Sequence, residues 1–495
     1  MESKKIIFLV AFFQIIGTFC LAQVKFEITY SSGRNDQARA ITQTMDSGYA
    51  VVGSTVSYEG NTDVYLMKTD QFGVFLWAKR YGELGMEWGQ DIVETTDSGL
   101  AILGYGHNNG VYDMLFIKTD KNGDSIYTKF IGETDWDFGY ALKQTPDKGF
   151  ILVGETYKTG TSKAYLVKID SNGNTEWKKT FGGVLKSKFE DVIIARNGDF
   201  LMAGETKAYG NGRQVYLVRT DSLGNLIWEK NYGNPGTDFA KSITQINSGD
   251  FVFAGGTNTP PYTDLDNWAG KIDSMGNLIQ NQVVIDYSPT PPSTQNNDWN
   301  ETVVKHNDSL VFAGQRSYGT GEPGNIYIYR YSNEINTSGY KDDFQKFMSP
   351  NVETAYDSKM TYDNGVIFAC TAEFIDTSES NIYLIKLDST MAYPHPYYNS
   401  ISHQYDYTSI SEKVKETEFS IYPNPSSSFS TINLEKFKKE LVTVTIFDSY
   451  GKLILNESTS ETNYLVDVSR YNSGIYFVRV NSKDVVKTKR LVISK

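Results

Sequence analysis

The sequence predicts an all-β protein, a seven-bladed β-propeller followed by a small Ig-like β-sandwich. An apolar, strand-like octet that mostly ends in Asp recurs seven times, hairpin-turn residues flank each copy, and the end of the chain has a different alternating pattern. Four short strands in each unit of about 50 residues are typical of a propeller. A β-solenoid is the alternative, but its turns are shorter than these units.

The first 22 residues contain the three regions of a secretory signal peptide in the usual order. Two lysines precede an apolar stretch over residues 6–19, and Ala22 provides a small residue before a cut ahead of Gln23. Cleavage before Cys20, as in a lipoprotein, is the alternative, but the bulky residue in front of it argues against that cut. The stretch is short for a bilayer span and no later one is longer. We therefore expect export and no transmembrane segment.

The recurring octet is the third of four strands, a to d, in each unit of a propeller expected over residues 23–400. An Asn-Gly or Ser-Gly type hairpin separates strands a and b, and an Asp-x-x-Gly turn separates strands c and d. Strand d is missing after the last unit, whereas residues 24–33 resemble one. We therefore expect the first strand to complete the last blade, which removes a free sheet edge.

Strand c has a cation at the same position in every unit. These residues are Lys68, Lys118, Lys168, Arg219, Lys271, Arg330 and Lys386. A charged channel for an ion or ligand is one interpretation, and repeated structural ion pairs are the other. Recurrence in every unit favours structure, because each repeat must solve the same packing problem. The Asp-x-x-Gly turns lack the remaining ligands of a calcium loop, so no metal and no cofactor is predicted.

Charge and composition bear on the class of function. A net charge of -12 argues against a nucleic-acid partner, which needs a basic face. The 4 histidines form no spaced cluster, and the metalloprotease, serine-hydrolase and Cys-x-x-Cys motifs are absent from the sequence. No catalytic residue is therefore predicted. Of the two cysteines, only Cys370 would remain after removal of the signal peptide.

The connections between strands b and c and between d and a vary in length and share one face of the predicted disc, which we call the loop face. Variable loops on a rigid scaffold are where binding residues collect. Aromatic rings there could stack on a sugar or peptide, or they could cap the blades structurally. The candidate ligand residues are Tyr262, Trp299, Tyr318, Trp88 and Trp136, with the acids Glu87, Asp137, Asp238 and Asp298 at the start of strand a.

The chain loses its repeats over residues 401–418, a predicted linker, and then shows ordered motifs over residues 419–495. These motifs are Tyr422-Pro423-Asn424-Pro425, Phe447-Asp448-Ser449-Tyr450-Gly451-Lys452, Ser473-Gly474-Ile475-Tyr476-Phe477 and Lys487-Thr488-Lys489-Arg490-Leu491. With them the tail resembles the C-terminal sorting domain of the bacterial type IX secretion system. The resemblance implies transit through the periplasm, handling by the type IX machinery, and release or attachment at the outer-membrane surface. The repeats loosely resemble kelch-like propellers.

Together these features predict a secreted or surface-displayed binding or adhesion protein, with glycan binding as a hypothesis. The alternative is an extracellular enzyme, a hydrolase or lyase, that acts on polysaccharide from a propeller scaffold. A third interpretation is a scaffold without a small ligand.

Overall fold

The structure of the chain is a computed structural model. It describes residues 24–56, 60–82, 85–158, 160–208, 212–233, 235–258, 265–284, 296–318, 324–332, 343–346, 352–374, 379–391, 405–406, 419–437, 441–448, 452–482 and 486–495. The predicted signal peptide, with its cut between Ala22 and Gln23, lies outside these residues. The chain divides into two compact units, Met1–Asp406 and Tyr407–Lys495.

The strands of the first unit pair mainly with their neighbours in the chain and form antiparallel groups of four. The first groups are β2 (Asp36–Gln43), β3 (Tyr49–Val56), β4 (Thr62–Thr69) and β5 (Phe75–Tyr81); β6 (Glu87–Glu94), β7 (Leu100–Asn108), β8 (Val111–Thr119) and β9 (Ser125–Ile131); and β10 (Asp137–Gln144), β11 (Phe150–Lys158), β12 (Thr161–Ile169) and β13 (Thr175–Phe181).

The middle of the unit repeats this pattern. It contains β14 (Ser187–Ile194), β15 (Phe200–Thr206), β16 (Gly212–Thr220) and β17 (Leu226–Tyr232); β18 (Gly236–Gln245), β19 (Phe251–Thr257), β20 (Asp266–Ile272) and β21 (Leu278–Val284); and β22 (Asn296–His306), β23 (Ser309–Tyr318), β24 (Asn325–Ser332) and β25 (Asp343–Lys346). A short parallel pairing of β16 with β18 joins two of these groups into one sheet.

The last group of the unit includes the first strand of the chain. β26 (Val352–Met360), β27 (Val366–Phe374) and β28 (Glu379–Leu387) are followed in the sheet by β1 (Phe26–Ser31) and β29 (Tyr405–Asp406). β1 pairs antiparallel with β28, with Phe26 opposite Lys386 and Tyr30 opposite Ile382. The expected pairing of the first strand with strand c of the last unit is therefore present.

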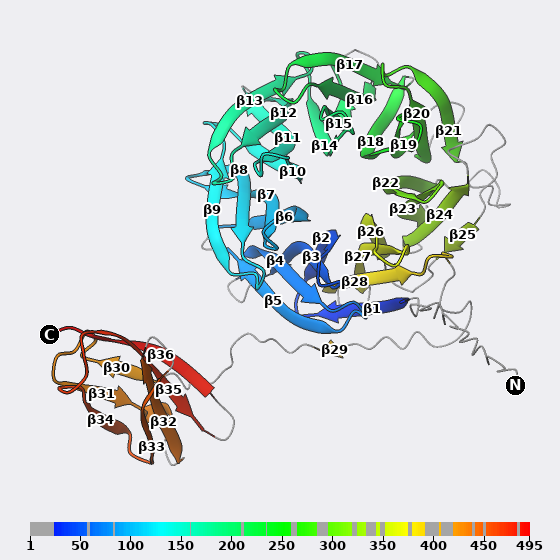
Figure 1. Cartoon of the computed structure of the whole chain (residues 1–495). Coiled ribbons are helices and arrows are strands. Elements are labelled where there is room, and N and C mark those ends of the chain that lie inside the picture. Colours follow the sequence, from blue (N-terminus) through cyan, green and yellow to red (C-terminus); the bar gives the residue numbers. More distant parts are fainter. Residues whose placement is uncertain are drawn as a thin grey trace, which may run out of the picture. The chain divides into compact units, whose positions relative to one another are not determined.

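These groups are arranged in a ring, with strand a of each group innermost and strand d at the rim (Figure 1). Each sheet is apolar on both faces because it packs between two neighbours. Val52 and Leu66 of one group, for example, share a buried cluster with Ile102 and Ile117 of the next. The first unit thus has a β-propeller-like all-β fold.

The strand c cations Lys68, Lys118, Lys168, Arg219, Lys271 and Lys386 form ion pairs inside their own groups. The buried ammonium groups of Lys68, Lys118 and Lys386 lie 3.0, 3.1 and 3.0 Å from Asp46, Asp97 and Asp363 of the a–b hairpin. Each also donates to the carbonyl of the following residue at 2.9 to 3.0 Å. These contacts favour the structural interpretation of the cation column.

Acid should weaken these hairpins. Burial alone would raise the pKa of Asp97, but hydrogen bonds from Thr95 and Gly99 and the Lys118 ammonium lower it to about 2, and an equivalent set lowers the pKa of Asp147 to about 2. The unfolded pKa is about 3.9, so this stabilisation is complete above that value and is lost as pH falls through about 2. The urea concentration at the midpoint of unfolding should fall between about pH 4 and 2. We expect this fall to be smaller in Asp97→Asn and in Asp147→Asn. Asp135→Asn, an exposed acid, is the control; an equally reduced fall there would contradict the assignment.

The second unit contains two antiparallel sheets around one core. The first sheet has β30 (Ser420–Tyr422), β31 (Phe429–Asn433) and β34 (Asn463–Asp467), and the second has β33 (Leu453–Thr459), β32 (Val442–Asp448), β35 (Gly474–Asn481) and β36 (Val486–Ile493). A short 3-10 helix, η1 (Glu435–Phe437), follows β31. Ile432 and Val466 of the first sheet share a buried cluster with Val444 and Val478 of the second.

Candidate functional site

Every inner strand has a β-bulge at the same register, and the bulged side chain is half-buried. The bulged residues are Arg39, Gln90, Tyr140, Glu190, Lys241, Glu301 and Tyr356, which we call the bulge ring. A bulge re-aims a side chain and is often found next to a functional site. The bulge ring is also asymmetric, because its members differ in charge and size while the strands around them repeat.

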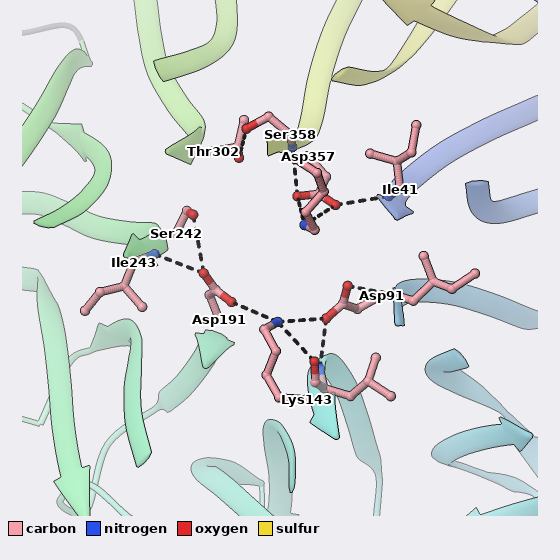
Figure 2. Close-up of polar contacts among 12 residues, drawn as sticks. Ile41, Asp91, Lys143, Asp191, Ser242, Ile243, Thr302, Asp357 and Ser358 are labelled. Carbon is pink, nitrogen blue, oxygen red and sulfur yellow. Dashed lines mark hydrogen bonds and ion pairs between the residues drawn. The ribbon is translucent and has the colours of Figure 1, made fainter. Parts of the chain in front are cut away.

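In three repeat units the residue after the bulge is an aspartate that links one inner strand to the next (Figure 2). Asp91 Oδ2 accepts the backbone N–H of Leu142 at 2.9 Å, Asp191 Oδ2 that of Ile243 at 3.0 Å, and Asp357 Oδ2 that of Ile41 at 3.0 Å. The other oxygen of each carboxylate accepts the N–H of its own following residue. We call these three contacts the aspartate latches. Because they are charge-assisted, they hold the inner strands firmly.

A lysine joins two of the latches. Lys143 Nζ lies 3.5 Å from Asp91 Oδ2 and 3.9 Å from Asp191 Oδ1 (Figure 2). Burial alone would lower the pKa of Lys143, but the surrounding carboxylates of Asp91, Asp191 and Asp357 raise it. The lysine therefore stays charged, and this layer is a structural brace beneath the bulge ring.

The bulge ring itself contains a balanced charge network. Lys241 Nζ lies 3.1 Å from Glu190 Oε1 and 3.9 Å from Glu301 Oε2, and Lys188 Nζ lies 2.6 Å from Glu190 Oε1. Burial alone would raise the pKa of Glu190, yet the two lysines lower it to about 2. Glu190 is therefore an ionised partner for cations and does not have the raised pKa of a general acid.

Aromatic side chains of the second and third repeat units of the ring form one cluster on the loop face. Their ring centroids lie 4.9 to 6.4 Å apart along a continuous chain of contacts. The members are Trp88, Tyr105, Tyr112, Trp136, Phe138, Tyr140 and Tyr157, which we call the aromatic cluster. Trp136 is 49% exposed and the others are half-buried. Through Tyr140 the aromatic cluster is continuous with the bulge ring.

The structure brings together two of the predicted ligand residues and separates or omits others. Trp88 and Trp136 belong to the aromatic cluster. Trp299 lies half-buried on β22, where its Nε1 donates to Glu301 Oε1 at 2.6 Å. Tyr318 ends β23, and its side chain lies outside the described residues, as does all of Tyr262.

The predicted acids at the start of strand a are buried and bonded to nearby loop or strand groups. Asp137 accepts the N–H of Glu133 at 2.8 Å, and Asp238 accepts the hydroxyl of Thr257. Asp298 lies 3.8 Å from Arg316. Glu87 is 5% exposed. These carboxylates therefore organise the strand ends.

Sequence reasoning missed the bulge ring and Tyr112. A signal for the ring existed in the aligned repeats, where the bulge column changes between Arg, Gln, Tyr, Glu and Lys while the residue before it is mostly Ala or Gly. The aspartate latches are interrupted in the same alignment, because Ala40 and Ala141 occupy the equivalent positions in the first and third units. The bulge decides which aligned residues of strand a face the axis of the ring. A bulge cannot be recognised from the sequence alone, so this orientation could not be predicted.

In the tail, the described residues of the predicted sorting motifs lie at strand ends. Asn424 Oδ1 accepts the N–H of Val492 at 2.8 Å, and Ser430 Oγ donates to Pro423 O at 2.9 Å. Pro425 sits beside them, before Ser426, whose N–H donates to the Val492 carbonyl. Gly474 begins β35 and Tyr476 is buried in it, whereas Gly451 lies outside the described residues.

No helix in the described part of the chain is both long and apolar enough to cross a membrane. No three His, Cys, Asp or Glu side chains in that part of the chain are grouped as they would be to hold a metal ion.

Comparison with known families bears on the tail. Residues 420–494 match the family described as the secretion system C-terminal sorting domain. The match supports the resemblance drawn from the tail motifs and indicates secretion through the type IX system to the cell surface or extracellular space. No curated protein matches the chain.

Solved structures resemble the ring at the level of fold. The polysaccharide lyase Uly1 is 8% identical with a TM-score of 0.47, and the match covers 74% of this chain and 100% of that one. The β-propeller domain of the Trilobed protease from Pyrococcus furiosus is 10% identical with a TM-score of 0.44, covering 74% and 100%. An ulvan lyase of family PL25 is 10% identical with a TM-score of 0.45, covering 72% and 94%. At these identities the likeness concerns the β-propeller fold alone.

Proposed function

We propose that the chain is a secreted or cell-surface binding protein whose ring of sheets captures a glycan through the aromatic cluster. The aromatic cluster is the observation that supports this proposal. It offers an exposed Trp136 ring on half-buried neighbours that hold it in place, and such rings stack on the apolar faces of sugars. The adjoining bulge ring supplies hydrogen-bonding groups beside it.

The proposal includes a domain plan. Residues 1–22 are a signal peptide, residues 23–400 a seven-bladed propeller in which β14–β17 and β18–β21 are separate blades, residues 401–418 a linker, and residues 419–495 an Ig-like sorting domain. The type IX machinery is the partner of the sorting domain. The kelch-like nature of the repeats and a ligand site at Tyr262, Trp299 and Tyr318 stay predictions.

Substitution of Trp136 tests the proposed function. Removing a stacking ring at a binding hot spot costs about 2 kcal/mol, or roughly thirtyfold in affinity. We expect Trp136→Ala to weaken binding to a polysaccharide chosen from a glycan array by that order, measured by calorimetry. The melting temperature should change little, because the ring is half exposed.

Two further variants sharpen this test. Tyr362→Ala removes another exposed ring, 64% accessible, outside the loop face, and should bind normally. If Trp299→Ala abolishes binding while Trp136→Ala does not, the site lies in the later units. Absence of any glycan binding would contradict the proposed function, and release of reducing ends would favour the polysaccharide-acting enzyme.

A further inference from the structure

Successive units have structurally equivalent residue pairs at the rim of the loop face. In each pair, a residue at the end of strand b donates its backbone N–H to a carbonyl of the d–a connection. His107 donates to Met86 at 3.1 Å in the second unit, Tyr157 to Trp136 at 2.8 Å in the third, and Lys207 to Lys186 at 2.8 Å in the fourth. The pair Tyr157 and Trp136 of the aromatic cluster is therefore followed, in the next repeat unit, by the equivalent pair Lys207 and Lys186.

The lysine pair belongs to a cationic sector on an otherwise acidic face. The sector comprises the connections at 155–163, 182–188 and 205–214, which contain two acids and the cations Lys158, Lys163, Lys186, Lys188, Lys207 and Arg213. The neighbouring connections at 132–138 and 257–266 contain acids and no cation. The chain has a net charge of -12, so the positive charge of this sector is opposite in sign to the charge of the whole protein.

Several cations of the sector already have acidic or carbonyl partners. Lys188 and Arg213 share Glu205, at 4.0 and 3.3 Å, and Lys163 donates to the Gly182 carbonyl at 3.2 Å. Lys186 and Lys207 are exposed and form no ion pair with any described residue. These two are the groups that an external anion could reach.

The lysine pair and the aromatic cluster are in direct contact. Lys186 Nζ lies 5.9 Å from the centroid of the Tyr157 ring, and that centroid lies 5.9 Å from the Trp136 ring. One ligand could therefore place a sugar ring on Trp136 and an acidic group at Lys186 and Lys207. Uronate carboxylates and sulfate esters are the acidic groups that polysaccharides offer, and lysine ammonium groups bind both as point charges.

We propose that the ligand is an anionic polysaccharide, bound with its sugar rings on the aromatic cluster and its acidic groups on Lys186 and Lys207. This inference rests on the proposed glycan-binding function and adds the class of glycan. Charge complementarity supports it, since the connections of the units beside the rings contain six cations and two acids.

The test uses the full secreted chain and four polymers: polygalacturonate, a sulfated galactan, neutral laminarin and polyglutamate. We expect at least one of the two acidic polysaccharides to bind more tightly than laminarin and polyglutamate, with affinity that falls as salt rises. The double variant Lys186→Gln/Lys207→Gln should lose about tenfold in affinity for it and much of the salt dependence. Lys121→Gln/Lys148→Gln, which removes two exposed lysines from the turns of the opposite face, should behave as the unchanged protein.

The outcomes separate this inference from the proposed function. Preference for uronate or for sulfate identifies the acidic group. Equal binding of laminarin, or no effect of the Lys186/Lys207 variant, overturns the anionic ligand and leaves glycan binding standing. Polyglutamate binding as tight as that of the acidic polysaccharides overturns it by showing an unspecific polyanion surface. No binding to any polysaccharide overturns both.

Discussion

Removal of residues 419–495 is expected to leave the ring of sheets folded but held in the periplasm. The two compact units divide near residue 406, and the buried cluster of the tail is built from its own strands, with Val444, Val478 and Leu491 at its centre. The ring therefore does not need the tail to form its core. The match of residues 420–494 to a sorting domain places the export signal in the removed part.

Cell fractionation measures this result. The shortened protein should follow a periplasmic marker, whereas the full chain should appear at the cell surface or in the medium. A melting curve of the recovered protein is the control, because it separates a folded but retained protein from an unfolded one. The shortened protein outside the cell would contradict the role of the tail, and so would failure of the tail to export a fused periplasmic reporter.

Deletion of residues 24–33 is expected to cause the largest loss of stability in the ring. β1 covers the edge of β28, and Tyr30 is buried and donates its hydroxyl to the Gly73 carbonyl in the first repeat unit. β1 thus attaches the last sheet to the first. Its loss exposes a strand edge, which is a template for pairing with another chain. The burial of Tyr30 alone contributes about 2 kcal/mol.

Size-exclusion chromatography and thermal melting check this expectation. The deletion variant should form oligomers or aggregates and melt at a lower temperature than the full chain. Tyr30→Phe removes only one hydroxyl and should keep the oligomeric state of the full chain at a cost of about 1 kcal/mol. A deletion variant that stays monomeric with an unchanged melting temperature would show that β1 does not close the ring.

Much of the architecture could be predicted because the repeats impose it. The columns at Lys118 and Asp120 locate strands c, and the unmatched first strand indicates pairing with strand c of the last unit, which the structure shows with Phe26 opposite Lys386. Trp88 and Trp136 were found because aromatic residues stand out in variable loops. Their contacts with Tyr112 could not be found, because they depend on the register of two sheets.

For the candidate acids, the sequence predicted the position but could not decide the role. Asp137 and Asp238 occupy an acidic column at the start of strand a. From the sequence alone, this column is equally consistent with a ligand site and with a turn. Only the fold shows that the Glu133 N–H and the Thr257 hydroxyl approach them. These bonds give both carboxylates a structural role that the sequence does not reveal.

The aspartate latches have a consequence for how such a ring could change in evolution. They join the second repeat unit to the third, the fourth to the fifth and the seventh to the first, while the sixth contacts the seventh through the hydroxyls of Thr302 and Ser358 at 2.7 Å. The units are therefore not interchangeable. Loss of the second or the fourth repeat unit alone would place Ala40 or Ala141 where the next strand needs a carboxylate and leave a buried N–H without its acceptor, at a cost of about 1–3 kcal/mol. Gain or loss of a latched pair avoids that penalty, so such a pair is more easily gained or lost together than its first unit alone.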